Sequence, residues 1–258
     1  MKRYLFTQTL ALGFFTIAFS QVNTERLRVF GDKPGWNHSF QAAFAYASGN
    51  SDFARLSGTW RTDFERKPRE LLLVANFERG ISNNNRYVNK GFGHVRALYR
   101  VTEPLKAEIF LQKEYNEFTR LQDRQLAGAG LRWKMISHAP MGQNPKSGLW
   151  MYLGVGGMYE VEQIKDEPTE TTRLFRSTNY LTFYIDLGNQ VSLNTVGYFQ
   201  IAPIHPKDFR ILAENNVTVT LAKNIALTSG ISFRYDNQPP TKVKPYDFSL
   251  MQGLRVAL

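Results

Sequence analysis

The chain has 258 residues, a formal net charge of +10 and no cysteine. This length is enough for one β-barrel or for one or two ordinary domains, and a chain without cysteine holds neither a disulfide framework nor a thiolate metal site. The slightly polar mean hydropathy of −0.35 excludes a bundle of transmembrane helices, but it does not exclude a barrel with one polar face.

The N-terminus has the three parts of an export signal. Lys2 and Arg3 precede an apolar stretch over residues 10–19, which ends in the small-x-small tripeptide Ala18-Phe19-Ser20. This order predicts a signal peptide over residues 1–20 that is cleaved before Gln21. We expect residues 21–35 to be a short periplasmic lead-in and residues 36–258 to form an outer-membrane β-barrel.

No later apolar run approaches the roughly 18 residues that a spanning helix needs. The longest covers residues 71–75, which is the size of a strand. An exported chain of this kind either stays soluble outside the cytoplasm or enters a membrane as a β-barrel.

From residue 36 onward, segments with alternating apolar and polar residues are separated by turns. In the first segment Phe40, Phe44 and Tyr46 share one face, and Ser39 and Gln41 share the other. This alternation predicts an all-β fold, an antiparallel up-and-down transmembrane barrel with apolar residues toward lipid and polar residues toward the lumen. We expect about twelve strands, over residues 39–46, 55–65, 71–82, 90–102, 105–118, 124–137, 148–162, 174–186, 190–201, 209–221, 224–236 and 247–258.

The connections between these segments mostly alternate in length, as the periplasmic turns and outer loops of bacterial barrels do. The short ones are expected at 102–104, 187–189 and 222–223, and the long ones at 83–89, 163–173, 203–207 and 237–246. Two connections break the rule, a tight outer one at 49–50 and a long periplasmic one at 138–146. An even number of strands places both ends of the barrel on the periplasmic side.

Two residues stand out in this pattern. The last segment alternates up to Leu258, as in a closing strand that pairs with the first strand, although Phe is the usual final residue. Lys113 falls on the apolar face, where a charge at the bilayer midplane costs about 2–4 kcal/mol. Either a bulge shifts the register around Lys113 or its side chain snorkels to the interface.

The polar face carries many charged residues, and these are the candidate lumen-lining residues. The alternation places the following side chains inward: Arg55, Arg61, Asp63, Glu65, Glu78, His94, Arg96, Arg100, Glu108, Glu114, Arg124, Arg132, Glu160, Arg176, Arg210, Glu214, Arg234, Asp236 and Arg255. One interpretation is a paired arginine–carboxylate network that fills and rigidifies the barrel. The other is a surplus of arginines that favours small anions in a pore.

Four segments resemble the salt-induced outer-membrane protein family, the YdiY-like proteins classed as a domain of unknown function. They are residues 45–52 (AYASGNSD), 107–118 (AEIFLQKEYNEF), 124–132 (RQLAGAGLR) and 235–240 (YDNQPP). Their order and spacing carry the resemblance over nearly all of the mature chain. It implies an outer-membrane barrel and a link to salt stress, and it supplies no catalytic residues.

These patterns together predict a non-enzymatic barrel in the outer membrane of a Gram-negative bacterium. It would serve the envelope structurally or act as a narrow, porin-like channel for small anionic or polar solutes. Its expected partners are outer-membrane lipid, the barrel assembly machinery during biogenesis and small solutes. Nucleic acid is not expected, because the basic residues are spread over strands.

We expect no cofactor, no metal and no catalytic site. Two alternatives stay open. One is an outer-membrane lipase or protease with its active site at the rim, for which only His94 has a plausible inward position. The other is a secreted, soluble β-barrel that binds an apolar ligand.

Overall fold

The computed structural model describes residues 35–49, 52–139, 147–166, 168–188, 190–222 and 225–256. The expected signal peptide and all but the last residue of the expected lead-in lie outside the described residues. So do parts of the connections expected at 49–50, 138–146, 187–189 and 222–223, and the last two residues of the chain. Within the described residues, no helix is long and apolar enough to cross a membrane.

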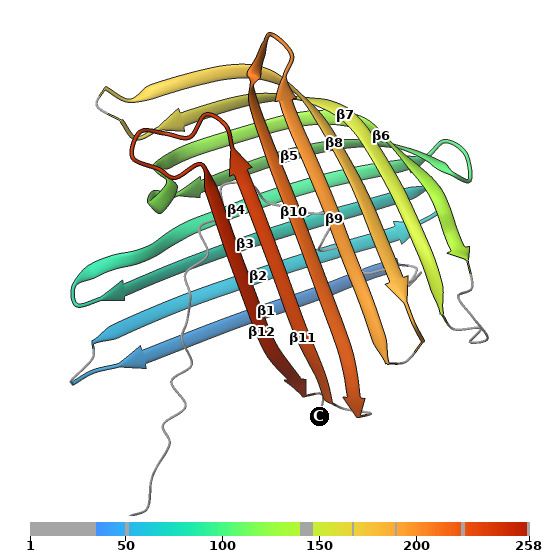
Figure 1. The fold of residues 1–258 in the computed structure, drawn as a ribbon, viewed down its shortest axis with the longest axis horizontal. Helices are drawn as coiled ribbons and strands as arrows, with labels where there is room; N and C mark the ends of the chain where they lie inside the picture. Colours follow the sequence, from blue (N-terminus) through green and yellow to red (C-terminus); the bar gives the residue numbers. More distant parts are fainter. Residues whose placement is uncertain are drawn as a thin grey trace, which may run out of the picture.

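In the described part of the chain, twelve antiparallel strands form a single sheet in which the spatial order is the sequence order (Figure 1). This confirms the all-β, up-and-down architecture that the alternation predicts. The strands are β1 Gly35–Ala47, β2 Phe53–Arg66, β3 Arg69–Ser82, β4 Asn85–Arg100, β5 Leu105–Asn116, β6 Leu121–Ala139, β7 Gly148–Ile164, β8 Glu170–Asp186, β9 Val191–Ala202, β10 His205–Ala222, β11 Ile225–Asp236 and β12 Tyr246–Val256. A short 3₁₀ helix, η1 (Glu117–Thr119), joins β5 to β6.

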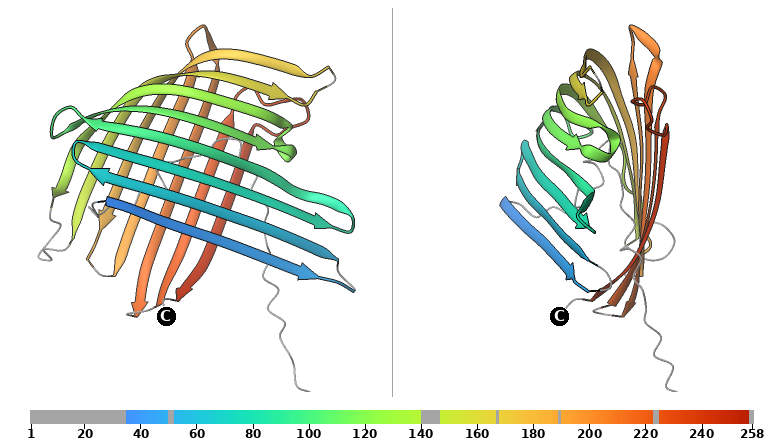
Figure 2. Two further views of the ribbon diagram at one scale, coloured as in Figure 1. Left: turned by 180° about the vertical axis from the view of Figure 1, so that it is seen from behind. Right: turned by 90° about the vertical axis from the view of Figure 1, so that its left-hand side faces the viewer.

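The sheet curls over so that β1–β4 and β9–β12 face each other as two walls, joined through β5–β8 (Figures 1 and 2). Within the described residues β1 pairs only with β2 and β12 only with β11, so these two strands are the edges of the sheet. The expected pairing of the last strand with the first is therefore not made in this structure. β1 has no Asp, Glu, Lys or Arg, so it takes no part in the ion pairs that link other strands across the interior.

Two connections that the sequence predicts to be long are tight turns. β3 and β4 are joined by Asn83 and Asn84 alone, whose φ angles of 47° and 61° both lie in the left-handed region. Asparagine tolerates this region, and two such residues in succession match the right-handed twist of a hairpin. β10 likewise starts at His205, so only residues 203 and 204 separate it from β9. Among the connections described in whole or in part at this end of the sheet, 237–245 is the longest with nine residues, and 48–52 and 165–169 have five each.

Small residues allow the close approach of strands where the sheet bends between its two walls. A Cβ atom on Gly156 of β7 would lie 2.4 Å from the backbone oxygen of Ala129 in β6. A Cβ atom on Gly154 would lie 2.1 Å from the ring of Tyr180, which crosses β7 at this point. Larger residues at these positions would push the strands or the ring away, so the glycines are needed for the packing of β6, β7 and β8.

The sheet has two ends, which differ in the connections they carry. We call the end where β1 begins and β12 ends the terminal end, and the end that carries connection 237–245 the loop end. Lys113 lies near the loop end of β5 opposite Gln125, and the register shift between β5 and β6 lies just beyond it, between Glu114 and Asn116. Its side chain is 70% exposed and its Nζ lies 3.3 Å from Oδ1 of Asp123.

Candidate functional site

The inner face of the curled sheet buries charged side chains, which is unusual unless these groups are paired. Alternate residues along β4–β8 and β10 point inward, and the residues between them are more exposed. Among the described residues, the buried cations are Lys90, Arg96, Arg124, Arg132, Arg176, Arg210 and Arg234, and the buried anions are Glu78, Glu108, Glu114, Glu160, Glu162 and Glu214.

Glu160 of β7 is the centre of the densest group of charges. Its Oε1 accepts a hydrogen bond from Nε of Arg176 at 2.7 Å. Its Oε2 accepts hydrogen bonds from Nε of Arg124 at 2.7 Å and from Nη1 of Arg210 at 3.1 Å. Only 1% of Glu160 is exposed. One carboxylate thus connects three strands, β6, β8 and β10, inside the sheet.

Two of these arginines bind further carboxylates. Nη1 of Arg124 donates to Glu114 of β5 at 2.8 Å. Arg176 binds the carboxylate of Asp208 in β10 through both terminal nitrogens, at 2.7 and 2.8 Å. The two-pronged geometry of this pair fixes the orientation of the guanidinium as well as its position.

The third arginine continues the group toward the loop end. Nη2 of Arg210 lies 3.1 Å from Oε2 of Glu162, and its Nε donates to Asp236 at 2.8 Å. The result is a set of ion pairs from β5 to β11. We call this set the loop-end network: Glu114, Arg124, Glu160, Glu162, Arg176, Asp208, Arg210 and Asp236.

The loop-end network is richer in acid than in base. Three guanidinium groups face five carboxylates, so its formal charge is 3 − 5 = −2 when all groups are ionised. Burial of charges is costly and is offset only when each charge has well-placed partners. Each of the three arginines meets this condition through at least two carboxylates.

An apolar layer and a second polar group lie next to this network toward the terminal end. Phe110, Leu126 and Met158 form a buried apolar cluster on β5, β6 and β7. Beyond it, the hydroxyl of Tyr180 donates to Oε2 of Glu108 at 3.1 Å. The Tyr180 ring thereby reaches from β8 over β7 and β6 to β5, across the inner face of the bend.

Arginines complete this second group. Nη1 of Arg96 lies 3.4 Å from Oε2 of Glu108, and the guanidinium carbon of Arg132 lies 4.2 Å from the centre of the Tyr152 ring. An arginine over an aromatic ring gains cation–π attraction in a place that water reaches poorly. The interior is therefore layered, with charged, apolar and mixed layers in turn.

The wall formed by β9–β11 is different at the terminal end. There, the positions that share the inward face with Val196 and Glu214 carry uncharged, half-buried side chains. We call these residues the terminal-end wall: Ser192, Asn194, Asn216, Thr218 and Thr228.

Most of the sequence-predicted lumen residues are buried in the structure. Glu78, His94, Arg96, Glu108, Glu114, Arg124, Arg132, Glu160, Arg176, Arg210, Glu214 and Arg234 are all buried. The partly buried ones pair locally, Arg55 with Glu78, Arg61 with Asp63 and Arg100 with Glu103. Arg255 lies in β12 opposite Ala226, and its side chain is outside the described part of the chain. Their role in handling a solute stays a prediction.

Sequence reasoning missed three members of the interior. Glu162 lies two residues after Glu160 and therefore on the same face, so the alternation alone would have found it. The same holds for Lys90, four residues before His94. Asp208 was out of reach, because it falls between the loop expected at 203–207 and the strand expected from residue 209, whereas β10 begins at His205.

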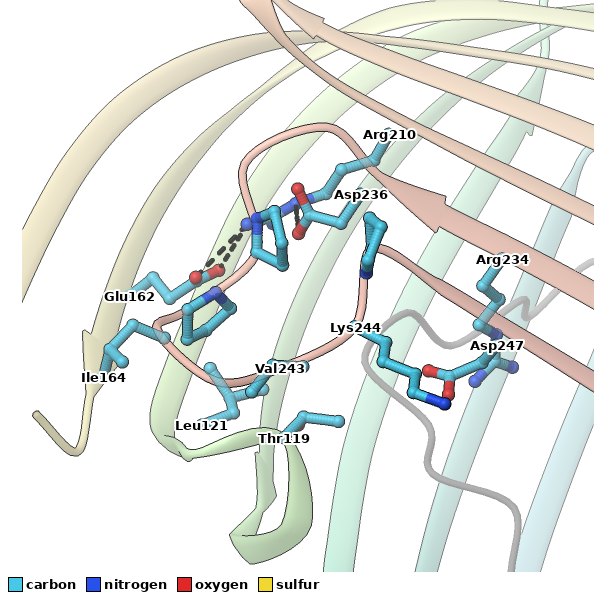
Figure 3. Close-up of a pocket in the computed structure, with 13 residues that line it drawn as sticks. Thr119, Leu121, Glu162, Ile164, Arg210, Arg234, Asp236, Val243, Lys244 and Asp247 are labelled. Atoms are coloured by element: carbon cyan, nitrogen blue, oxygen red, sulfur yellow. Dashed lines mark hydrogen bonds and ion pairs between the residues drawn. The ribbon is translucent and has the colours of Figure 1, made fainter.

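Connection 237–245 covers part of the network from the loop end. A cavity of about 30 Å³ lies between this connection and the ends of β6 and β7 (Figure 3). Leu121, Ile164 and Val243 line it from the apolar side, and Glu162 and Arg210 from the charged side. A space of this size is enough to hold a water molecule.

A family model described as "Protein of unknown function, DUF481" matches residues 40–257. No curated protein matches the chain. Two solved structures are similar to it. The NanC porin in a rhombohedral crystal form has a TM-score of 0.46 and 7% identity, and the match covers 86% of this chain and 99% of that chain. A porin refined at 1.8 Å resolution has a TM-score of 0.37 and 10% identity, covering 82% of this chain and 65% of that chain.

Proposed function

The chain belongs to the DUF481 family of proteins of unknown function, and we propose that it is an outer-membrane β-barrel that acts as a narrow channel for small polar solutes. This family assignment agrees with the resemblance seen in the sequence motifs. The observation that carries the proposal is the opposite character of the two faces of one sheet. The inner face is polar and charged, and the outer face is apolar.

The outer face supports contact with lipid. Phe40, Ile109 and Leu111 are 73%, 62% and 62% exposed in the middle part of their strands. A soluble protein rarely exposes such a continuous apolar surface. Exposed aromatic residues flank this zone at both ends, as in the interfacial girdles of outer-membrane barrels. They are Trp36, Tyr99 and Trp133 toward the terminal end, and Tyr46, Phe118 and Tyr246 toward the loop end.

In a bilayer the two edge strands would have to pair. Unsatisfied backbone groups are very costly in hydrocarbon, so open sheet edges do not occur there. We propose that β1 and β12 close the barrel in the membrane. Their side chains fit this arrangement, since Phe40 and Phe44 of β1 and Phe248 and Leu250 of β12 are all exposed on the apolar face.

The interior supports a narrow passage and not an open pore. The terminal-end wall offers hydroxyl and amide groups that can replace the hydration of a polar solute. The loop-end network and connection 237–245 restrict the other end. The expected preference for anions gains no support from the loop-end network, where carboxylates outnumber guanidinium groups. We therefore propose that the channel passes small polar solutes without a preference for anions.

The interior histidine supports a non-enzymatic role. His94 is 2% exposed, and its Nδ1 lies 3.0 Å from Oε1 of Gln112. Its ring also stacks on Phe110 at 5.9 Å. A histidine packed between an amide and an aromatic ring is held as a structural group, and it is far from the rim that a surface substrate would reach. Replacement of His94 by Ala should leave lipase and protease assays of the purified protein at background.

The direct test of the channel is conductance of the refolded chain 21–258 in planar bilayers. We expect small, discrete current steps with a reversal potential that shows no preference for anions. Absence of steps in bilayers that contain folded, heat-modifiable protein would refute the channel. Recovery in the outer-membrane fraction, with a mature N-terminus at Gln21, would support the proposed location and the expected assembly route. Recovery as a soluble protein would refute both.

A further inference from the structure

Connection 237–245 has an internal structure that stiffens it. The backbone N–H of Asp236 donates to the carbonyl of Pro245 at 2.8 Å, which closes the base of the connection. The N–H of Val243 donates to the carbonyl of Pro240 at 2.9 Å, which forms a turn at its tip. Three of its nine residues are proline, whose fixed φ angle reduces the freedom of the backbone. The connection is therefore a preformed flap and not a loose loop.

One side chain fastens this flap to two other connections at the loop end. Nη1 of Arg120 donates to the carbonyl oxygen of Thr241 at 2.9 Å and lies 2.6 Å from Oδ1 of Asp166. A single guanidinium thus joins the β5–β6, β7–β8 and β11–β12 connections, although Arg120 and Thr241 are 121 residues apart. Figure 1 shows these three connections side by side at the loop end.

The position of Arg120 is fixed by the turn that carries it. Arg120 follows η1 and has a φ angle of 58°, in the left-handed region. Its backbone N–H donates to the carbonyl of Glu117 at 3.2 Å, and its carbonyl accepts from the N–H of Lys165 at 2.8 Å. The backbone of Arg120 is thus held by β5–β6 and β7–β8 together, and its side chain is directed at the flap.

The flap lies directly over the charged interior. Pro239, Pro240 and Val243 form one side of the small cavity, and Glu162 and Arg210 of the loop-end network form another (Figure 3). Any solute that enters between β6, β7 and β11 from the loop end must pass the flap. Between the flap and these two residues there is a space of about 30 Å³, which is enough for a water molecule.

We propose that connection 237–245 sets the upper size of the solutes that pass, and that Arg120 is the residue that holds it in the restrictive position. This inference rests on the proposed channel function. The contact between Arg120 and Thr241 is exposed to solvent. An exposed polar contact is individually weak, so its loss leaves the barrel folded. Without Arg120 the flap is no longer held over the charged interior, and larger solutes can pass it.

The first experiment uses proteoliposomes that swell when a polar sugar enters. The variant is Arg120→Ala, and the matched control is Arg86→Ala. Arg86 is at the same rim and lies 3.0 Å from Oε2 of Glu117, but its described ion pair does not involve the flap. We expect Arg120→Ala to admit larger sugars than the native protein and to raise the swelling rate of the largest permeant sugar several-fold. Arg86→Ala should behave as the native protein does.

A second variant replaces the polar contact by a covalent one. The chain has no cysteine, so in Arg120→Cys/Thr241→Cys the two new thiols are the only reactive ones. Bridging them with a bis-methanethiosulfonate cross-linker, which forms a disulfide with each thiol and releases methanesulfinate, should return the size limit to the native value or below it. Reduction of the bridge should then raise the limit to that of Arg120→Ala.

The outcomes separate the two proposals. If the native protein admits small sugars but all variants share its size limit, the flap does not set the limit and this inference is wrong. If no folded variant, open or bridged, admits any solute, the channel itself is refuted and the inference fails with it. A size limit that moves with Arg120 and with the bridge, and not with Arg86, supports both.

Discussion

The loop-end network and the terminal-end wall line the same interior, but they are built from different side chains. In the network, Arg124, Glu160 and Arg176 are each 1% exposed and bind one another across several strands. In the terminal-end wall, Asn194 and Asn216 are half-buried and uncharged. The difference separates two tasks within one sheet. Ion pairs join the strands in the loop-end network, whereas the terminal-end wall presents hydroxyl and amide groups, which we propose as the groups that contact the solute.

The largest expected effect comes from breaking the network at its centre. Glu160→Gln removes the charge that Arg124, Arg176 and Arg210 share, and leaves these guanidinium groups buried with fewer partners. Loss of one partner from a buried ion pair costs about 3–5 kcal/mol. We expect the urea midpoint of the refolded barrel, followed by tryptophan fluorescence, to fall accordingly.

The control for this change is Glu103→Gln at the terminal end. Glu103 pairs with Arg100 at 3.0 Å, but its side chain is 78% exposed. An exposed pair contributes about 0–1 kcal/mol, so this variant should unfold almost as the native protein does. An equal fall of the urea midpoint in the two variants would show that the loop-end network does not stabilise the barrel more than an exposed ion pair does.

The next effect concerns the bend that brings the two walls together. Gly156→Ala places a Cβ atom 2.4 Å from the oxygen of Ala129 and 2.8 Å from Cα of Gly130, so β6 and β7 must move apart. Overpacking of this kind costs about 1–3 kcal/mol. The matched variant is Gly197→Ala, whose Cβ atom meets nothing within 4 Å. Urea unfolding should separate the two, and a loss in Gly197→Ala as large as that in Gly156→Ala would contradict this account of the bend.

A smaller effect is expected on ion selectivity. Glu162→Gln removes one negative charge that borders the cavity under connection 237–245. A unit charge about 10 Å from an ion path, screened by salt, shifts the energies of cations and anions in opposite directions, and the two shifts together amount to on the order of 1 kcal/mol. The cation-to-anion permeability ratio, measured from reversal potentials, should fall about fivefold by that energy. Asn194→Ser in the terminal-end wall should leave the ratio unchanged, and a shift of equal size there would remove the contrast between the two ends.

The smallest effect is expected on the outer face at the loop end. Lys113→Met removes an exposed ion pair with Asp123, so the free energy of unfolding in lipid should change by less than about 1 kcal/mol. A charge at the midplane would behave differently, because its removal would stabilise the barrel by about 2–4 kcal/mol. A gain of that size would place Lys113 deep in the bilayer and overturn its assignment to the rim.

The alternation of residues was enough to predict the strands, since the number and order of the twelve follow from it. The turns were harder to predict from the sequence. The length of the β3–β4 turn depends on the left-handed φ angles of Asn83 and Asn84, and a polar sequence allows these angles but does not require them. Alternation also predicts which side chains point inward. It does not predict their partners, since Arg210 meets Glu160 through the curl of the whole sheet, 50 residues away in sequence.

The neighbour-to-neighbour order of the sheet has a consequence for folding kinetics. Each ladder joins two strands that are consecutive in the chain, so the described pairings need only short loops to close. The entropic cost of loop closure is then small at each step, and hairpins can add to a growing sheet one at a time. Contacts that skip strands, such as Tyr180 with Glu108, form only after the intervening strands are in place. The ion pairs of Arg210 with Glu160 and Glu162 skip β8 and β9 in the same way, so we expect them to form late in folding, after the sheet has curled.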